Sequence, residues 1–589
     1  MRVTKNILRK CRDVYQQEGL AALAKKILRK LKGAKVKDGR PVLPDVAKEY
    51  EQLQLGKATV YEKWRNLHKV SEEEKARQRQ HAFPYMPLIS IVVPVYNTKD
   101  EYLRALMDSV LAQTYARWEL CMTDGLSTLP SVKKTLDEYA AKDKRISAIY
   151  LKENHGISGN TNEGLKLCHG EYVVFSDHDD LLEDTALFEV ARAANEGAEV
   201  IYTDEDKVNF DSSVFYEPHL KPEYSPEKLE SCNYFCHLTA VSRRIIDAVG
   251  MLDSRFDGSQ DHEFVLRACD ATDKIAHVPK VLYHWRQFGE SMSKQHLEKC
   301  QAAGRLAVKE HLARLNREGE VGQAHGYRVV YPLPKTAKIS VITVAHKKNP
   351  VVCENLFGKI AGVTTEIIVV NKTGEELAAD QRIVLTSEAN DFAARNMAVK
   401  QSTGDYLLFI DENIASCSPN AVQELLMFAQ LQEIGAVGGK IYVAGSENIF
   451  ATNYIMGKKN VGRYFANHSK NVIGNGGMER ITRNVSALPM ELFMVKKTDF
   501  LKIGGFDERY QKYYGDADFC LRLLEAGLRN VFTPFAEFDL ICGETAGGFL
   551  PQDNDDWKIF RENPLHLLDK YCRLSFEDEV KEAEDETVG

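Results

Sequence analysis

The stretch LISIVVPVY at residues 88–96 decides the fold class. It is a continuous apolar, β-branched run of strand length, which predicts a strand buried on both faces, as in a parallel sheet. Helical and strand patterns then alternate through a helix at 102–115, a strand at 118–124, a helix at 132–143, a strand at 146–151, a helix at 159–168 and a strand at 172–177. We therefore expect an open, mostly parallel α/β sheet.

The second half of the chain repeats this pattern. Three of its segments echo earlier ones in the same order: KISVITVAHKK at 338–348 echoes 88–98, GDYLLFIDEN at 404–413 echoes 170–179, and the stretch starting at 505 echoes the one starting at 251. Self-similarity at a fixed spacing predicts two copies of one domain. We expect the first copy over 88–325 and the second over 337–576.

Composition narrows the class of protein. The chain has 589 residues, of which 44% are hydrophobic and 28% charged, as in soluble globular proteins. No apolar run approaches the roughly 18 residues that span a bilayer, and the first 20 residues lack the apolar core of a signal peptide. Twelve scattered cysteines do not form a disulfide framework. We expect a cytoplasmic protein, and its net charge of −8 does not favour binding of nucleic acid.

The two ends carry opposite charge. Residues 1–40 hold 13 Lys and Arg against three acids, with apolar residues at helical spacing, whereas residues 577–589 hold seven acids and one Lys. We expect residues 1–87 to form a basic amphipathic helical extension and linker. The helix could lie on an anionic membrane surface at the inner face of the cell membrane, or its charges could simply face solvent.

Acidic residues gather where the predicted strands of the first copy end. Asp124 ends one strand, and the run Asp177-His178-Asp179-Asp180 follows another. Adjacent carboxylates repel one another unless a cation lies between them, which points to Mg²⁺ or Mn²⁺ and to phosphates bound through the metal. The alternative is an acidic loop that caps a helix starting near Leu181. No phosphate-binding glycine loop follows a strand, which disfavours ATPase and dinucleotide sites.

These residues resemble the family 2 glycosyltransferases of the GT-A fold, in particular multidomain bacterial enzymes that build O-antigen and related polysaccharides. The resemblance covers about 88–300 with specific motifs and 337–550 more loosely. It implies that Asp177 and Asp179 hold the metal and the donor diphosphate. It also implies that Pro94, Tyr96 and Asp124 bind the nucleoside. The family usually has Asp-Asp at the second strand, whereas here Gly125 follows Asp124, so the base could be uracil, thymine or guanine.

The resemblance also assigns the chemistry. GSQDHEFVLR at 258–267 resembles the motif that carries the catalytic base, which makes Asp261 the base, although Asp261 could instead cap a helix. HVPKVLYHWR at 277–286 resembles the closing motif, which implies His284 as third metal ligand and Arg286 as a diphosphate contact. Asn162 lies where the family contacts the donor. Cys232, Cys236 and His237 lack a matching second pair and are not expected to form a metal site.

The second copy keeps the scaffold and loses some of this chemistry. Its metal motif becomes Asp411-Glu412-Asn413, Asn371 stands at the end of the second strand, and Arg395 and Asp516 keep the donor and base positions. An asparagine ligates a metal without contributing charge, so metal affinity should fall. Two interpretations stay open: a second transferase with other donor demands, or a non-catalytic module that binds a glycan or a partner.

The predicted function is an inverting transfer of a sugar from a UDP- or dTDP-linked donor to a glycan or lipid-linked glycan. In it, Asp261 activates the acceptor hydroxyl while metal and Arg286 stabilise the departing diphosphate. A sugar nucleotidyltransferase is a rival enzyme, but PVYNTKDEY at 94–102 is not the glycine-rich loop it needs. A glycan-binding or assembly protein is a rival without catalysis.

Overall fold

A computed structural model describes residues 36–37, 40–41, 59–286, 297–347, 362–377, 382–387, 389–457, 460–471, 477–542, 548–563, 566 and 569–572. Two strands of two residues each, β1 (Val36–Lys37) and β2 (Arg40–Pro41), pair antiparallel. The amphipathic helix expected before them and the acidic tail 577–589 lie outside the described residues. Within the described residues, no helix is long and apolar enough to cross a membrane.

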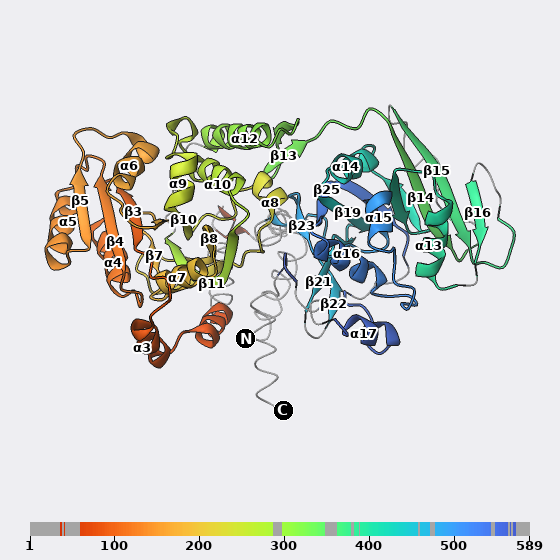
Figure 1. The fold of residues 1–589 in the computed structure, drawn as a ribbon, viewed down its shortest axis with the longest axis horizontal. Helices are drawn as coiled ribbons and strands as arrows, with labels where there is room; N and C mark the ends of the chain where they lie inside the picture. Colours follow the sequence, from red (N-terminus) through yellow and green to blue (C-terminus); the bar gives the residue numbers. More distant parts are fainter. Residues whose placement is uncertain are drawn as a thin grey trace. The chain divides into compact units, whose positions relative to one another are not determined.

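The described residues form two compact units (Figure 1). The N-terminal unit contains residues 50–224 and 232–329, and the C-terminal unit contains residues 330–574 together with Ser225–Ser231. The N-terminal unit therefore takes in more than the expected 88–325, because a helix at 59–68 and α3 (Glu72–Gln80) belong to it. The expected connector before residue 337 instead contains paired strands β12 (Glu320–Gln323) and β13 (Tyr327–Val330).

The N-terminal unit is built on one mixed sheet with the strand order β5-β4-β3-β6-β10-β8-β11-β7, and β9 pairs with β8. Strands β3, β4, β5 and β6 run parallel, and β10 runs antiparallel between β6 and β8. The strands are β3 (Ile89–Val95), β4 (Trp118–Asp124), β5 (Ile146–Tyr150), β6 (Tyr172–Phe175), β7 (Leu181–Leu182), β8 (Val200–Val208), β9 (Phe215–His219), β10 (Thr239–Ser242) and β11 (Ile275–Arg286). The α/β class predicted from the sequence is confirmed.

Helices cover this sheet, as Figure 1 shows. They are α4 (Asp100–Leu111), α5 (Pro130–Lys142), α6 (Gly156–Leu165), α7 (Ala186–Asn195), α9 (Arg243–Val249), the short 3₁₀ helix η1 (Ser254–Phe256), α10 (Gln260–Asp270) and α12 (Leu297–Arg314). Helix α8 (Pro226–Ser231) belongs to the C-terminal unit, where it packs near β23.

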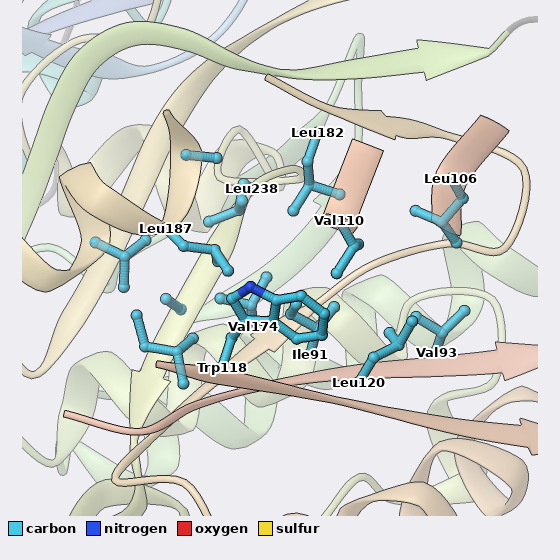
Figure 2. Packing of buried hydrophobic residues seen from close by; sticks show 14 of the residues in the cluster. Ile91, Val93, Leu106, Val110, Trp118, Leu120, Val174, Leu182, Leu187 and Leu238 are labelled. Atoms are coloured by element: carbon cyan, nitrogen blue, oxygen red, sulfur yellow. The ribbon is translucent and has the colours of Figure 1, made fainter. Parts of the chain in front are cut away.

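The core of the N-terminal unit surrounds Trp118, whose indole lies among side chains of β3, β4, α4 and α7 (Figure 2). All seven residues of β3 are buried, as its unbroken apolar run predicts. Burying an aromatic side chain of this size removes about 150–250 Å² from water, so Trp118 is a principal stabiliser of this core.

The C-terminal unit repeats the same topology. Its strand order, β16-β15-β14-β17-β24-β19-β25-β18, matches the N-terminal sheet position by position, including an antiparallel β24 between β17 and β19. Its strands are β14 (Ala337–Ala345), β15 (Val363–Asn371), β16 (Arg382–Thr386), β17 (Tyr406–Ile410), β18 (Ile414–Cys417), β19 (Ile434–Val443), β20 (Ile449–Ala451), β21 (Tyr454–Met456), β22 (Val461–Arg463), β23 (Arg483–Val485), β24 (Leu492–Lys496) and β25 (Arg529–Leu540). Its helices are α13 (Asp391–Gln401), α14 (Ala421–Ala429), α15 (Lys497–Lys502), α16 (Gly515–Glu525) and α17 (Asp555–Phe560).

Polar contacts repeat as well. In the N-terminal unit, Asn162 donates to the carbonyl of Leu252 at 2.8 Å and accepts from its N–H at 3.0 Å. In the C-terminal unit, Asn396 makes the same two contacts with Phe506, at 2.8 and 3.0 Å. These paired contacts identify equivalent positions in the two units more firmly than sequence alone.

Candidate active site

The carboxyl ends of β3, β4 and β6 meet at one edge of the N-terminal sheet. Val95, the last residue of β3, pairs with Asp124, the last residue of β4. The acidic run that begins at Asp177 follows β6. Ligands of open α/β sheets bind at this edge, so these side chains form the candidate site.

Three side chains at this edge come together as possible metal ligands. One ligand atom each of Asp177, Asp180 and His237 lies within 4.8 Å of the others. The imidazole Nε2 of His237 is 3.9 Å from Asp177 Oδ2. Two carboxylates and an imidazole suit a divalent cation such as Mn²⁺ or Mg²⁺.

Asp180 gives an independent reason to expect a cation. Its carboxylate is fully buried and accepts hydrogen bonds from Tyr283 Oη at 2.6 Å and from the N–H of Arg286 at 2.7 Å. Burial, together with the nearby carboxylates of Asp179 and Asp177, raises its pKa well above the ordinary value. A divalent cation would relieve this repulsion, so the residues fit a metal.

His237 is held firmly in this position. The Lys221 ammonium is fully buried and donates to the carbonyls of Phe235 and His237, both at 2.6 Å. The N–H of His237 donates to Glu205 at 3.1 Å, and its ring stacks on Tyr283 with centroids 4.7 Å apart. The backbone and ring of His237 are thus fixed before any ligand binds.

Two of the predicted metal ligands, Asp179 and His284, are not members of this group of three. His284 is buried, and its ring contacts Asp206 at 2.6 Å and Glu183 at 3.2 Å. Burial lowers the pKa of His284, but these two carboxylates outweigh it and raise the pKa to about 9. Asp179 lies 3.8 Å from His178 and is not part of the group of three. Among the predicted ligands, only Asp177 belongs to that group.

Arg286 orders the backbone next to the acidic edge. Its guanidinium donates to the carbonyls of Asp179, Asn209 and Phe210 at 2.7 to 2.9 Å. Arg286 is 2% exposed, and its Nη2 is buried without a hydrogen-bond partner among the described residues. Most of the guanidinium therefore orders backbone, and one nitrogen is left for an anion.

The predicted nucleoside residues lie along β3 and β4. Pro94 is within β3, Tyr96 follows it and is 47% exposed, and Asp124 is buried and accepts from the N–H of Ser127 at 3.0 Å. Asn97 orders the same loop, because its side chain accepts from the N–H of Thr128 at 2.7 Å. An exposed aromatic ring beside an ordered polar loop suits stacking against a base.

Gly125 lies close to Asn160 of α6. A Cβ at Gly125 would lie 2.3 Å from Asn160 Nδ2, so a second aspartate at this position would require the Asn160 side chain to move. Asn162, which the sequence predicts to contact the donor, forms hydrogen bonds to the backbone of Leu252 through both its side-chain nitrogen and its side-chain oxygen.

Asp261 lies in the first turn of α10 and is exposed. Its Oδ2 accepts from Asn233 Nδ2 at 2.9 Å. Asn233 and His237 belong to one short loop, so the same loop contacts the predicted base and supplies a possible metal ligand. An exposed, oriented carboxylate near a metal site can accept a proton from an incoming hydroxyl.

The C-terminal candidates are arranged differently. Asp411 Oδ1 accepts from Asn413 Nδ2 at 2.7 Å, and Arg395 is buried. Asp516 is 3% exposed and accepts from Tyr454 Oη at 2.9 Å and from the N–H of Met490 at 2.7 Å. Burial and the neighbouring Glu491 raise the pKa of Asp516 to about 6.

The sequence analysis did not predict His237 or Asp180 as metal ligands. Asp180 directly follows the predicted Asp-x-Asp motif, and His237 stands in NYFCHL just before β10. The signal was present in principle, because a strand that pairs with β6 must bring the residues before it toward Asp177. The cysteines beside His237 are not part of the group of three.

A mixed α/β sheet of this order, with carboxylates at its carboxyl edge, defines a GT-A-like domain. Residues 90–247 match the family described as Glycosyl transferase family 2. Residues 90–247 of the N-terminal unit are therefore a family 2 glycosyltransferase domain, as predicted from the sequence.

Curated relatives are similar over most of this chain. An uncharacterised protein of Sinorhizobium fredii, y4gI, is 32% identical over 77% of this chain and 52% of its own length. The O-antigen biosynthesis protein RfbC of Myxococcus xanthus is 33% identical over 78% of this chain and 38% of its own length. This chain thus spans about half or less of these relatives. The solved structure of S. aureus TarS 1-349 in complex with UDP-GlcNAc is 20% identical over 38% of this chain and 66% of its own, with a TM-score of 0.33.

Proposed function

We propose that the N-terminal unit is an inverting glycosyltransferase that moves a sugar from a UDP- or dTDP-linked donor to a growing cell-surface polysaccharide or a lipid-linked glycan. The observation that carries the proposal is the group Asp177, Asp180 and His237, joined through one loop to the exposed Asp261. The similarity to a protein named for O-antigen biosynthesis supports a polysaccharide acceptor.

Asp177, Asp180 and His237 would hold Mg²⁺ or Mn²⁺. Bound there, the cation would supply Lewis-acid stabilisation to the negative charge of the donor diphosphate. The sequence predicts Asp179 and His284 as metal ligands, and that stays a prediction. We choose Asp180 and His237 here because their ligand atoms lie within 4.8 Å of each other and of Asp177. The buried Nη2 of Arg286 is suited to one further contact with the same anion.

Asp261 acts as the base in this proposal. It takes the proton of the acceptor hydroxyl while that oxygen attacks the anomeric carbon from the face opposite the diphosphate. Asn233 orients the carboxylate by donating to one of its oxygens, which leaves the other for the hydroxyl. A single displacement of this kind inverts the anomeric configuration.

Tyr96 and Asp124 bind the nucleoside in this proposal, with Pro94 shaping the end of β3. Asn162 positions α6 through Leu252 rather than touching the donor itself. Residues 1–40, of which the structure describes only 36–37 and 40, would hold the enzyme on an anionic membrane at its cytoplasmic face. Deletion of residues 1–40 should then move the protein out of the membrane fraction.

The test is release of nucleotide from a panel of nucleotide sugars with Mn²⁺ and glycan acceptors. We expect Asp261→Asn to slow release about 10²- to 10⁴-fold, the usual contribution of a general base. Asp247→Asn, an exposed change on α9, is the matched control and should leave the rate unchanged.

Three outcomes would contradict the proposal. A rate within about tenfold of wild type in Asp261→Asn would remove the base assignment. Turnover only with a nucleoside triphosphate and a sugar phosphate would make the protein a nucleotidyltransferase. Binding of glycan without any turnover would leave it a glycan-binding module.

A further inference from the structure

Among its described residues, the C-terminal unit has no group of three possible metal ligands like Asp177, Asp180 and His237. Strand β10 pairs with β6 at Thr239↔Phe175, and β24 pairs with β17 at Phe493↔Phe409. Thr239 and Phe493 are therefore equivalent, and counting back two residues from each places Glu491 where the N-terminal unit has His237. Asp411 is the counterpart of Asp177. Ile414, three residues after Asp411, is therefore the counterpart of Asp180.

The groups at the two equivalent positions differ from those of the N-terminal unit, and only Oε2 of Glu491 is left without a hydrogen-bond partner among the described residues. Glu491 pairs with Arg463 at 2.8 Å, and Ile414 is apolar. Asp411 is left with Asn413 as its neighbour. Within the described residues, the grouping of three metal-capable side chains occurs in the N-terminal unit. The C-terminal donor set therefore does not fit a divalent cation.

Side-chain cations stand in this region instead. Lys347 lies two residues beyond β14, where the N-terminal unit has Asn97, and its ammonium donates to Asn413 Oδ1 at 2.6 Å. Lys372 follows Asn371, where the N-terminal unit has Gly125, and donates to Asp391 at 2.8 Å. The N-terminal unit thus has neutral residues at two positions where the C-terminal unit has lysines. Both positions lie at the same edge of the equivalent sheets.

Arg395 adds a third cation. It precedes Asn396, so its counterpart is Thr161, which precedes Asn162. Arg395 is 7% exposed, and its Nε is buried without a hydrogen-bond partner among the described residues. Burial lowers the pKa of Arg395, and the carboxylates of Asp391 and Asp411 act in the opposite direction, so the guanidinium lies near the carboxylates of this edge. A buried guanidinium with a free donor is costly unless an acceptor binds there.

The base position is closed in the same unit. Asp516 is the counterpart of Asp261, but Asp516 is buried and accepts from Tyr454, Met490 and Ala517. Asp261 is exposed, and its Oδ2 accepts a hydrogen bond from Asn233. An incoming hydroxyl therefore has no open carboxylate at Asp516.

We propose that the C-terminal unit binds a phosphate-bearing ligand through Lys347, Lys372 and Arg395 without a divalent cation, and that it does not transfer sugar. The inference rests on the proposed function, because it assigns the second half of the same chain a role beside the transferase. The ligand class is a diphosphate, either on a nucleotide or on a lipid-linked glycan, since both present the same anionic group to the three cations.

The test uses the full-length protein. Titration with Mn²⁺ should show one site per chain, abolished by Asp177→Asn and unchanged by Asp411→Asn. In EDTA, Asp177→Asn protein should still bind inorganic pyrophosphate. Lys347→Gln in that background should weaken binding at least about tenfold. Lys347 is exposed, so this change should not unfold the unit. Lys400→Gln, an exposed lysine on α13, is the control and should bind as before.

The outcomes separate the two proposals. A second Mn²⁺ site lost in Asp411→Asn, no pyrophosphate binding in EDTA, or equal binding by the Lys347 and Lys400 variants would each overturn this inference. Competition by UDP points to a nucleotide, and competition by an undecaprenyl diphosphate in detergent points to a lipid-linked glycan. Nucleotide release by wild type in Mn²⁺ tests the transferase independently of these binding results.

Discussion

Two histidines near the acidic edge have different surroundings, and these separate their roles. His237 lies beside Asp177, whereas His284 has both ring nitrogens against the carboxylates of Asp206 and Glu183. An imidazolium held by two carboxylates is poorly suited to ligate a metal, because a ligand nitrogen must be unprotonated. Residue identity and strand position alone made His284 the better candidate.

We expect His237→Ala to weaken Mn²⁺ binding by at least about tenfold, a loss seen even for residues that only support a ligand. His284→Gln should leave Mn²⁺ affinity within about threefold, because its ring contacts carboxylates outside the group of three. Calorimetric or electron paramagnetic titration measures both. Loss of Mn²⁺ binding in His284→Gln with retention in His237→Ala would restore the original assignment.

The raised pKa of His284 predicts a pH dependence of stability. The folded-state pKa of about 9 exceeds the ordinary 6.5, so the stabilisation is complete below about pH 6.5 and is lost as pH rises through about 9. The corresponding change is on the order of 3 kcal/mol. Urea unfolding from pH 6 to 10, in EDTA, should show this loss for wild type.

His284→Gln should flatten that pH dependence. The variant should be less stable than wild type at pH 6 and lose little more by pH 10. An unchanged slope in the variant would show that another group titrates in this range. Such a result would leave the contacts with Asp206 and Glu183 as structural observations without the predicted energetic weight.

At the scale of elements, the first strand and the loop before β6 are locked together in the same way in both units. Ser90 donates to Glu119 at 2.6 Å, and the N–H of Gly170 donates to Ser90 at 2.8 Å. In the C-terminal unit, Ser340 donates to Glu366 at 2.5 Å and Gly404 to Ser340 at 2.9 Å. Burial raises the pKa of Glu366, but the hydrogen bonds from Ser340 and Thr403 outweigh it and lower the pKa to about 2.

Gly404→Ala should loosen this lock. A Cβ there would lie 2.4 Å from Ser340 Oγ and 2.6 Å from the Ser340 nitrogen, so β14 or the loop before β17 must move. We expect a loss of about 1–3 kcal/mol in the free energy of unfolding of the C-terminal unit, as for other overpacked sites. Urea unfolding followed by a C-terminal probe measures it, with Lys400→Ala as the exposed control.

The alternation of strands and helices could be predicted from the sequence. The apolar run of β3 and the helix after it have the periodicity of their structures, so the α/β class followed from local pattern. The antiparallel β10 did not follow from local pattern, because its place between β6 and β8 depends on pairing between segments far apart in the sequence. The position of His237 depends on that pairing, so the site was only partly predictable.

The burial of Asp516 was unpredictable for a related reason. Its carboxylate is closed off by Tyr454, which is 62 residues earlier in sequence, and by the backbone of Met490. No local motif marks either partner. Asp261 and Asp516 look alike in sequence, and only the tertiary contacts separate an exposed acid from a buried one.

At the scale of the molecule, the C-terminal unit includes α8 although that helix precedes it by about a hundred residues. Within this unit, Glu227 is almost fully buried and accepts from Arg529 at 2.7 Å. Removing one partner of a buried ion pair leaves the other charge uncompensated, at a typical cost of about 3–5 kcal/mol.

We expect Glu227→Gln to lower the unfolding temperature of the C-terminal unit and to leave that of the N-terminal unit unchanged. Scanning calorimetry of the full chain should resolve the two transitions, because each unit has its own apolar core. Glu223→Gln, outside α8, is the control. A shift of the N-terminal transition instead would assign α8 to the other core.

The place of β10 also bears on how the chain is made. Strands β6 and β8 leave the ribosome before β10, yet β10 must pair with both of them. Until residue 242 has emerged, two partly formed edges of the N-terminal sheet stay open to wrong pairing or to chaperones. His237 arrives in the same step, so a nascent chain gains its third possible ligand when β10 joins β6 to β8, before β11 (Ile275–Arg286) completes the sheet and its contacts to Asp180.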